Sequence, residues 1–252
     1  MTEPLLEVRG LVKRYGGLLA TDHLDLAIEA GECRALIGPN GAGKSTLIAQ
    51  LAGEVRQTAG SIRFDGVEVT ALSMPRRVRR GLARSFQITS VLPNFTAEDN
   101  VALAVQARLG HGFRFWRDAG RDPALREPAR AMLDEIGLGR RGAVRAGDLA
   151  YGEQRQLELA MALATKPRML LLDEPMAGMG PEESRRMVEV LRKLRGSVTL
   201  LLVEHDMDAV FALADQITVL VYGRAIVTGT PQAIRDDPMV ADAYLGQAEV
   251  DL

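Results

Sequence analysis

The sequence contains very little cysteine, and its charges are nearly balanced. One cysteine, Cys33, among 252 residues excludes an internal disulfide and a cysteine-rich metal cluster. The formal net charge is -2, with basic and acidic residues mixed along the chain, so no basic field favours nucleic acid as a partner. The scarcity of cysteine is typical of a reducing cytoplasm, and Cys33 lies in an apolar run where packing is its expected role.

Long apolar runs are also missing from the sequence. No run approaches the roughly 18 residues that a membrane-spanning helix requires. The first ten residues carry acid and proline instead of the basic-then-apolar pattern of a signal peptide. We therefore expect a chain that reaches a membrane only through a partner. With 47% hydrophobic residues it can still bury a substantial core.

A glycine-rich loop, GPNGAGKST, follows an early apolar run and precedes a helix-like one. It matches the pattern G-x-x-x-x-G-K-[ST], in which glycines let backbone N–H groups turn inward around phosphates. The lysine supplies a point charge for the β- and γ-phosphates, and the serine hydroxyl is a ligand for Mg²⁺. The loop therefore predicts an ATP and Mg²⁺ site formed by Gly38, Pro39, Asn40, Gly41, Ala42, Gly43, Lys44, Ser45 and Thr46.

Two neighbouring carboxylates end a second apolar run. Residues 169–172 predict a buried parallel strand, and Asp173 and Glu174 stand at its carboxyl end, where ligands bind in such sheets. Asp173 is expected to hold Mg²⁺ through a water or through Ser45, and Glu174 to polarise the attacking water as a general base. Alone, the two acids would simply end a strand in solvent. The glycine-rich loop favours the catalytic interpretation.

Two further polar residues follow predicted strands. His205 comes after Glu204 and the apolar run 198–203, where an imidazole could contact the γ-phosphate. Gln87 follows a predicted strand over 82–86, where its amide can reach Mg²⁺ or water and move with its loop. Without these neighbours, either residue would be interpreted as structural. The predicted catalytic residues are Lys44, Gln87, Glu174 and His205, and the predicted metal ligands are Ser45, Gln87 and Asp173.

In this order the motifs resemble those of the nucleotide-binding subunit of an ATP-binding cassette (ABC) transporter, over essentially the full length. The resemblance implies that Tyr15 stacks on adenine, although an aromatic at this place could simply pack at a strand end. It also implies that two subunits sandwich two ATP molecules, each site using one subunit's glycine-rich loop and the other's signature segment. The signature residues are Leu149, Ala150, Tyr151, Gly152, Glu153 and Gln154.

Several segments are similar to the branch of this family that serves branched-chain amino acid uptake and its relatives. They include LVEHDM, LAYGEQRQLELAMAL and YGRAIVTGTPQAIRDDPMVADAYLG. The resemblance implies two membrane permease subunits, a second ATP-binding subunit, identical or paralogous, and a substrate-binding protein upstream. It implies a peripheral position on the cytoplasmic face of the cell membrane. Relatives serve branched-chain amino acids, urea, short amides or aromatic acids, so the cargo stays open.

Two residues depart from the commonest family pattern. Ala150 replaces a serine whose hydroxyl contacts the partner-bound γ-phosphate, and Gly180 replaces an aspartate that follows Glu174. The lost charge-assisted hydrogen bond is worth on the order of 1.5–3 kcal/mol, so we expect weakened closure of the dimer. A module that closes on ATP but hydrolyses poorly is therefore one alternative. A non-transport ATPase acting on nucleic acid or ribosomes is another.

The expected fold is α/β, with a P-loop NTPase core, an antiparallel β layer and an inserted α-helical subdomain. Period-two patterning over 6–12, 25–28 and 61–64 predicts the antiparallel strands, with Asp65-Gly66 as a hairpin turn. We expect one ABC ATP-binding domain over 5–248. Within it, residues 5–86 and 155–248 form the core and β layer, and residues 87–154 form the helical subdomain with the signature segment.

Three other segments carry weaker signals. The basic run 76–80 is interpreted as a solvated helix face, with a membrane-surface or permease contact as the alternative. The segment 109–123 is rich in glycine, arginine and aromatic residues, and it either packs as a surface loop or contacts a permease. Residues 238–245 predict a final short helix.

Overall fold

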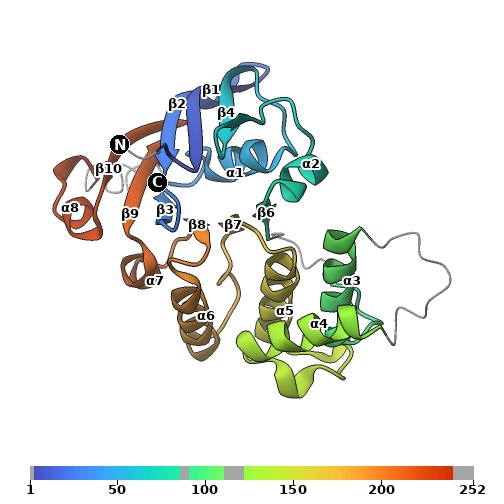
Figure 1. Cartoon of the computed structure of the whole chain (residues 1–252). Helices are drawn as coiled ribbons and strands as arrows, with labels where there is room; N and C mark the ends of the chain where they lie inside the picture. Colours follow the sequence, from blue (N-terminus) through green and yellow to red (C-terminus); the bar gives the residue numbers. More distant parts are fainter. Residues whose placement is uncertain (1–2, 86–90, 111–121, 241–252) are drawn as a thin grey trace.

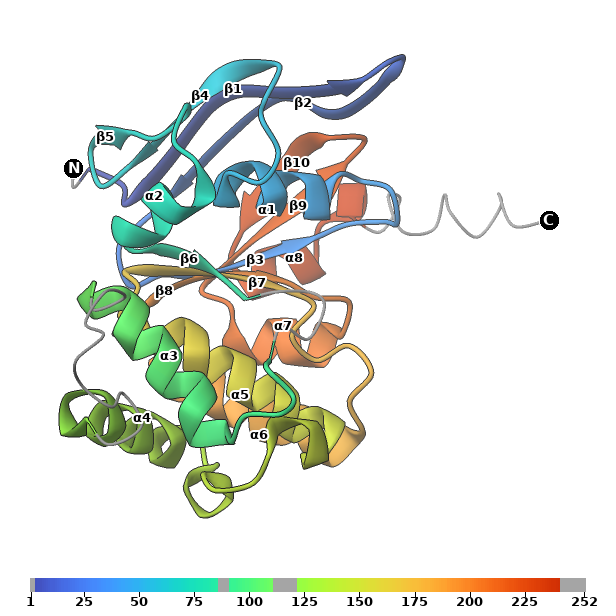
Figure 2. The same ribbon diagram turned by 90° about the vertical axis from the view of Figure 1, so that its right-hand side faces the viewer.

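Two β-sheets and a layer of helices build the protein. The computed structural model describes residues 3–85, 91–110 and 122–240. In Figures 1 and 2 a four-stranded sheet lies at one end of the molecule, a six-stranded sheet crosses the middle, and helices α3 to α6 cover its far face. This arrangement confirms the predicted fold class.

The four-stranded sheet is antiparallel and has the strand order β2-β1-β4-β5. Its turn at Asp65-Gly66 was predicted, and both residues have positive φ angles, 52° and 70°, as a tight hairpin turn requires. The second strand is longer than its predicted range of 25–28, because it pairs with the first along almost its whole length. The strands are β1 (Leu6–Tyr15), β2 (Leu18–Ile28), β4 (Ala59–Phe64) and β5 (Val67–Glu68).

The six-stranded sheet has the order β10-β9-β3-β8-β7-β6, and only its β9–β10 pair is antiparallel. Every residue of β3, β7 and β8 is buried, which explains their continuous apolar runs. Their parallel pairing brings their carboxyl ends to one edge of the sheet. The strands are β3 (Cys33–Ile37), β6 (Leu82–Arg84), β7 (Met169–Asp173), β8 (Thr199–Val203), β9 (Gln216–Val221) and β10 (Arg224–Gly229).

Helices cover both faces of this sheet. Helix α1 lies between the two sheets, while α3, α4, α5 and α6 lie on the opposite face (Figure 2). Strand β7 shows the division: Leu171 packs in the core with α1, and Leu170 and Leu172 pack in the core with the other helices. The helices are α1 (Lys44–Ala52), α2 (Met74–Arg79), α3 (Ala97–Leu109), α4 (Pro123–Glu135), α5 (Tyr151–Ala164), α6 (Pro181–Leu194), α7 (Met207–Leu213) and α8 (Pro231–Arg235).

Several smaller expectations can be compared with this fold. Cys33 packs in the core, and burial raises the pKa of its thiol to about 12. The division at 154/155 stays a prediction, and α5 runs across it. Most of 109–123 and of 238–245 lies outside the described residues. Within the described ranges, each helix is too short or too polar to cross a lipid bilayer.

The basic run 76–80 differs from its interpretation as a solvated helix face. Helix α2 contains it, but Arg77 is only 1% exposed. The Arg77 guanidinium donates to the carbonyls of Thr70 at 3.0 Å, Leu72 at 3.0 Å, Gln50 at 2.8 Å and Leu51 at 2.7 Å. The last two belong to the final turn of α1, where most carbonyls lack the N–H donor that the helix supplies elsewhere. Arg77 therefore fastens α2 to α1, and three neighbours, Arg76, Arg79 and Arg80, stay exposed.

We expect Arg77→Ala to lower the free energy of unfolding by at least about 3 kcal/mol, because four carbonyls each lose a donor and a cavity forms. Denaturant unfolding followed by circular dichroism measures this change. The matched control is Arg79→Ala on the exposed side of the same helix, which we expect to stay within about 0.5 kcal/mol of the parent. Equal stability of the two variants would contradict the structural role of Arg77.

Candidate nucleotide site

The glycine-rich loop joins β3 to α1 at the carboxyl edge of the six-stranded sheet. Gly38 has a φ of 145°, and a Cβ atom there would lie 2.0 Å from the Leu220 carbonyl oxygen of β9. Gly43 has a φ of 98°, and its Cβ would lie 2.1 Å from the Ala20 carbonyl oxygen of β2. Backbone packing on both sides therefore requires glycine at these two positions and sets the course of the loop.

Lys44 begins α1 and lies inside the loop with only 6% of its surface exposed. Its Nζ donates to the carbonyls of Gly38 at 2.6 Å and Pro39 at 2.9 Å. Burial lowers the pKa of Lys44, while the nearby charges of Glu174 and Asp173 act in the opposite direction. Two carbonyls position the ammonium without neutralising it, so its charge can act on a phosphate bound in the loop.

The first turn of α1 has no side-chain cap. Its backbone N–H groups therefore point from a helix N-terminus toward the loop interior, which is an arrangement that binds anions. Together with the cradle of the glycine-rich loop, this geometry suits a phosphate chain.

Asp173 ends β7 and is 2% exposed. Its Oδ2 accepts a hydrogen bond from Nη2 of Arg84 at 3.0 Å, whereas its buried Oδ1 has no hydrogen-bond partner among the described residues. Burial raises the pKa of Asp173, and hydrogen bonds from Arg84 and Ser45 oppose that shift. A buried carboxylate oxygen without a partner, close to a serine hydroxyl, fits the oxygen ligands that Mg²⁺ prefers.

Glu174 and His205 meet at the same edge. His205 Nε2 lies 2.7 Å from Glu174 Oε1, within hydrogen-bonding distance. Glu174 has a φ of 51°, a left-handed conformation that is strained for a residue with a Cβ atom. Its N–H donates to the Val203 carbonyl at 2.9 Å, which continues the β7–β8 pairing by one residue. Strain of this kind is concentrated at functional sites, and both side chains are partly exposed here.

Two charged residues of this edge were not assigned a role from the sequence. Arg84 is on β6 and ion-pairs with both Glu54 and Asp173. Glu204 is 5% exposed, and burial raises the pKa of its carboxyl group. Each is a charged residue in or directly after an apolar strand, and that contrast is the sequence signal that could have identified them.

The signature segment begins α5, with Ala150 as the N-cap and Tyr151 as the first helical residue. Glu153 accepts a hydrogen bond from the Ala150 N–H at 3.0 Å, which is half of a capping box. Alanine has no oxygen to complete it. Leu149, at the start of the segment, packs in the core on the face of the sheet opposite α1 (Figure 2).

The first turn of α5 packs against the segment that follows Glu174. The Tyr151 ring lies 3.2 Å from the place of a Cβ on Gly178, and Gly152 lies against the Glu183 carboxyl group. Gly180 is the N-cap of α6, and its N–H donates to Glu183 at 3.1 Å. Contact within one chain thus links the signature segment to the turn after the two strand-end carboxylates.

Tyr15 and Gln87 are the remaining predicted site residues. Tyr15 ends β1 and is 47% exposed, with the Lys13 ammonium 4.6 Å from its ring centroid. One of its ring faces is therefore covered by a cation. Gln87 lies outside the described residues, so its role stays a prediction.

The chain is similar to known proteins in both sequence and structure. The family described as ABC transporter matches residues 21–177, which is more than half of the chain. The chain belongs to the ABC transporter family. As an ABC cassette it binds ATP and is an ATPase, and the resemblance predicted from its motifs is confirmed.

Individual relatives match this ABC chain over their whole length. The high-affinity branched-chain amino acid transport ATP-binding protein BraF of Pseudomonas aeruginosa is 41% identical, covering 98% of this chain and 100% of that protein. LivG of Salmonella typhimurium, which has the same description, is 38% identical with the same coverage. A crystal structure of the ADP conformation of an ABC transporter cassette has a TM-score of 0.85 at 26% identity, covering 97% of this chain and 100% of that one.

We expect Ala150→Ser to complete the capping box of α5 and to stabilise the protein by about 0.5–2 kcal/mol. A hydroxyl at this position should also raise ATP turnover or tighten ATP-driven dimerisation. Thermal unfolding, phosphate release and size-exclusion chromatography with ATP measure these effects. Ala150→Val adds bulk without a hydroxyl and is the control. If the serine variant changes neither turnover nor dimerisation, the loss of the serine hydroxyl does not limit closure.

Proposed function

We propose that this chain is the ATP-hydrolysing subunit that powers import of branched-chain amino acids, or of related small amino-acid or amide substrates, through partner membrane permeases. The observation that carries the proposal is its similarity, at 41% and 38% identity over whole chains, to transport ATP-binding proteins for branched-chain amino acids. That similarity does not favour the alternative of an ATPase acting on nucleic acid or ribosomes.

In this proposal the carboxyl edge of the six-stranded sheet holds the triphosphate and its metal. The loop from Gly38 to Thr46 surrounds the phosphates, and Lys44 supplies charge to the β- and γ-phosphates. Ser45, Asp173 and Gln87 supply the oxygen ligands for Mg²⁺. When bound, Mg²⁺ neutralises charge that develops on the phosphate oxygens during transfer. The partnerless Oδ1 of Asp173 supports this assignment.

Hydrolysis is assigned to Glu174 and His205. Glu174 acts as the general base that orients and deprotonates the attacking water, and its left-handed backbone turns it out of the strand toward the site. The His205 imidazole, 2.7 Å from that carboxylate, orients it and reaches the γ-phosphate from the same edge. Two side chains from neighbouring strands thereby act on one water and one phosphate.

The working unit in this proposal is a pair of cassettes. The glycine-rich loop and the signature segment of one chain belong to opposite faces of its sheet, so a second subunit, identical or paralogous, supplies the signature segment to each ATP. Tyr15 stacks on the adenine through the ring face that Lys13 leaves open. The chain binds permeases at the cytoplasmic face of the cell membrane as a peripheral subunit, with a substrate-binding protein upstream.

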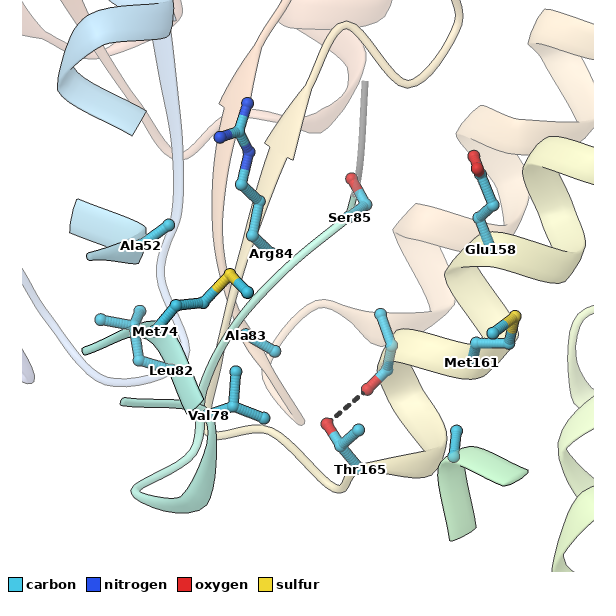
Figure 3. A pocket seen from close by; sticks show the side chains of 12 residues that line it. Ala52, Met74, Val78, Leu82, Ala83, Arg84, Ser85, Glu158, Met161 and Thr165 are labelled. Atoms are coloured by element: carbon cyan, nitrogen blue, oxygen red, sulfur yellow. Dashed lines mark hydrogen bonds between the residues drawn. The ribbon is translucent and has the colours of Figure 1, made fainter. Parts of the chain in front are cut away.

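A cavity between the core and the helical layer is the proposed permease contact (Figure 3). Its volume is about 200 Å³, and most of its lining is apolar. Met74 and Val78 of α2 lie on one side and Met161 of α5 on the other, with Ser85 between them. Ser85 is two residues before Gln87. A helix of a permease seated here would therefore bear on the segment that carries a proposed metal ligand.

We expect the tagged chain, isolated from gently solubilised membranes of its native cell, to bring two hydrophobic permeases and a second cassette identified by mass spectrometry.

Val78→Glu should lose the permeases, because it places a charge in the apolar cavity, while the isolated variant still hydrolyses ATP. Val67→Glu, on the exposed strand β5, is the control and should retain them. Recovery of ribosomal or nucleic-acid-binding proteins alone would overturn the transport proposal. Recovered complexes that drive no uptake of branched-chain amino acids or of related small amino-acid or amide substrates into vesicles would overturn the cargo.

We expect Glu174→Gln to bind ATP and to lower its turnover by about 10²- to 10⁴-fold, because the amide cannot accept the proton of the attacking water. Phosphate release and nucleotide retention after gel filtration measure the two effects. Glu182→Gln, on the exposed first turn of α6, is the control and should behave as the parent. Parent-like hydrolysis in Glu174→Gln would refute the assignment of the base.

A further inference from the structure

Glu204 occupies an unusual position between β8 and His205. It is a carboxylate with 5% exposure at the end of a fully buried strand. Its Oε1 accepts the Met176 N–H at 2.9 Å, and its Oε2 accepts the His205 N–H at 3.1 Å. The Asp206 N–H donates to the same carboxylate. Among the described residues, the ion pairs include none to Glu204, so backbone N–H groups are the donors that satisfy its charge.

These hydrogen bonds connect two segments that leave the sheet side by side. The β7–β8 pairing ends at Asp173 and Val203, followed by one more bond from the Glu174 N–H to the Val203 carbonyl. Beyond that point the two backbones no longer pair. The Glu204 carboxylate continues the connection, because one of its oxygens binds the segment after Glu174 and the other binds the segment of His205.

The same bonds explain how the conformation of Glu174 persists. A residue with a Cβ atom keeps a left-handed φ only where its surroundings fix the chain on both sides. The hydrogen bond from the Glu174 N–H to the Val203 carbonyl fixes the backbone at Glu174 itself. Two residues later, the hydrogen bond from the Met176 N–H to the Glu204 carboxylate fixes it again. The 2.7 Å contact between Glu174 and His205 joins the two segments that these bonds hold.

We propose that Glu204 is a positioning residue for hydrolysis, whose carboxylate holds Glu174 and His205 in register with each other. The inference rests on the roles of Glu174 and His205 in the proposed function. Glutamate suits this task because both of its oxygens accept hydrogen bonds. Glutamine has the same shape but offers one oxygen, and its NH₂ group would face a backbone N–H donor.

The test compares Glu204→Gln with the parent in steady-state hydrolysis and in binding of a fluorescent ATP analogue. We expect kcat to fall by about 10- to 100-fold and the Kd for the nucleotide to stay within about twofold, because the phosphate-binding loop is untouched. The control is Asp215→Asn, which removes a carboxylate that also accepts a backbone N–H, from Cys33 at 2.8 Å, at the start of β3 away from the site. It should keep the parent kcat.

A double-mutant cycle separates positioning from general stability. Because Glu204 acts partly through His205, Glu204→Gln should slow the His205→Ala variant by a smaller factor than it slows the parent. A parent-like kcat in Glu204→Gln, a loss of nucleotide binding equal to the loss of kcat, or fully multiplicative effects in the cycle would each overturn the inference. If Glu174→Gln hydrolyses like the parent, the proposed function of the pair fails. If Glu174→Gln is inactive but Glu204→Gln is not, only the present inference fails.

A second variant and a second measurement keep the test decisive if the glutamine variant folds poorly. Glu204→Asp stays charged but is one methylene too short to reach both segments, so it should show the same fall in kcat. The chain has three histidines, so the ring nitrogen signals of ¹⁵N-labelled His205 can be assigned by comparison with His205→Ala. In nucleotide-free Glu204→Asp these signals should move toward those of a solvent-exposed imidazole. An unmoved His205 signal would overturn the inference.

Discussion

Parallel pairing of three fully buried strands is the constraint on which the rest of the site depends. β7 pairs with β8 and β8 pairs with β3, so their last residues lie at one edge regardless of their separation in the sequence. Continuous apolar runs fix this pairing, because these strands have protein on both faces. The glycine-rich loop, the proposed metal ligand Asp173, and the proposed catalytic residues Glu174 and His205 stand at or directly after these strand ends.

Three carboxylates crowd this edge, and the structure holds each by a different means. Asp173 is held by Arg84, Glu174 by His205, and Glu204 by backbone N–H groups. Because their partners and burial differ, these three similar carboxyl groups differ in the charge and solvent around them. Asp173 and Glu204 are buried and fixed, whereas Glu174 is partly exposed and has the one titratable partner. The proposed general base is therefore the one of these three carboxylates that can reach solvent.

Arg84 extends this edge toward the proposed permease contact. It ion-pairs with Asp173 and also lines the cavity between α2 and α5, together with Ser85. A shift of β6 caused by a permease would therefore move a partner of the metal carboxylate as well as the proposed metal ligand that follows on the chain. In the proposed arrangement, β6 would transmit both the movement of a permease and the displacement of the Arg84 charge to the nucleotide site.

The sequence alone was sufficient for the fold class, the glycine-rich loop and the strand-end residues, because all of these rest on local spacing or continuous burial. It was insufficient where a side chain finds its partners on another element. Arg77 belongs to a run of exposed arginines, and its burial depends on carbonyls of α1 that no local pattern encodes. Glu204 and Arg84 were overlooked for a similar reason, since Met176, Asp173 and Glu54 belong to segments far from them in the sequence.

The two glycines of the glycine-rich loop determine which substitutions the site tolerates. Gly38 and Gly43 press against carbonyl oxygens of Leu220 and Ala20, not against their side chains. The neighbours can therefore change their side chains without disturbing the loop, while the glycines themselves admit no substitute. Substitutions at positions 20 and 220 can therefore change the packing of β2 and β9 without changing the loop that binds the nucleotide. The stability of the protein can then change separately from its catalytic rate.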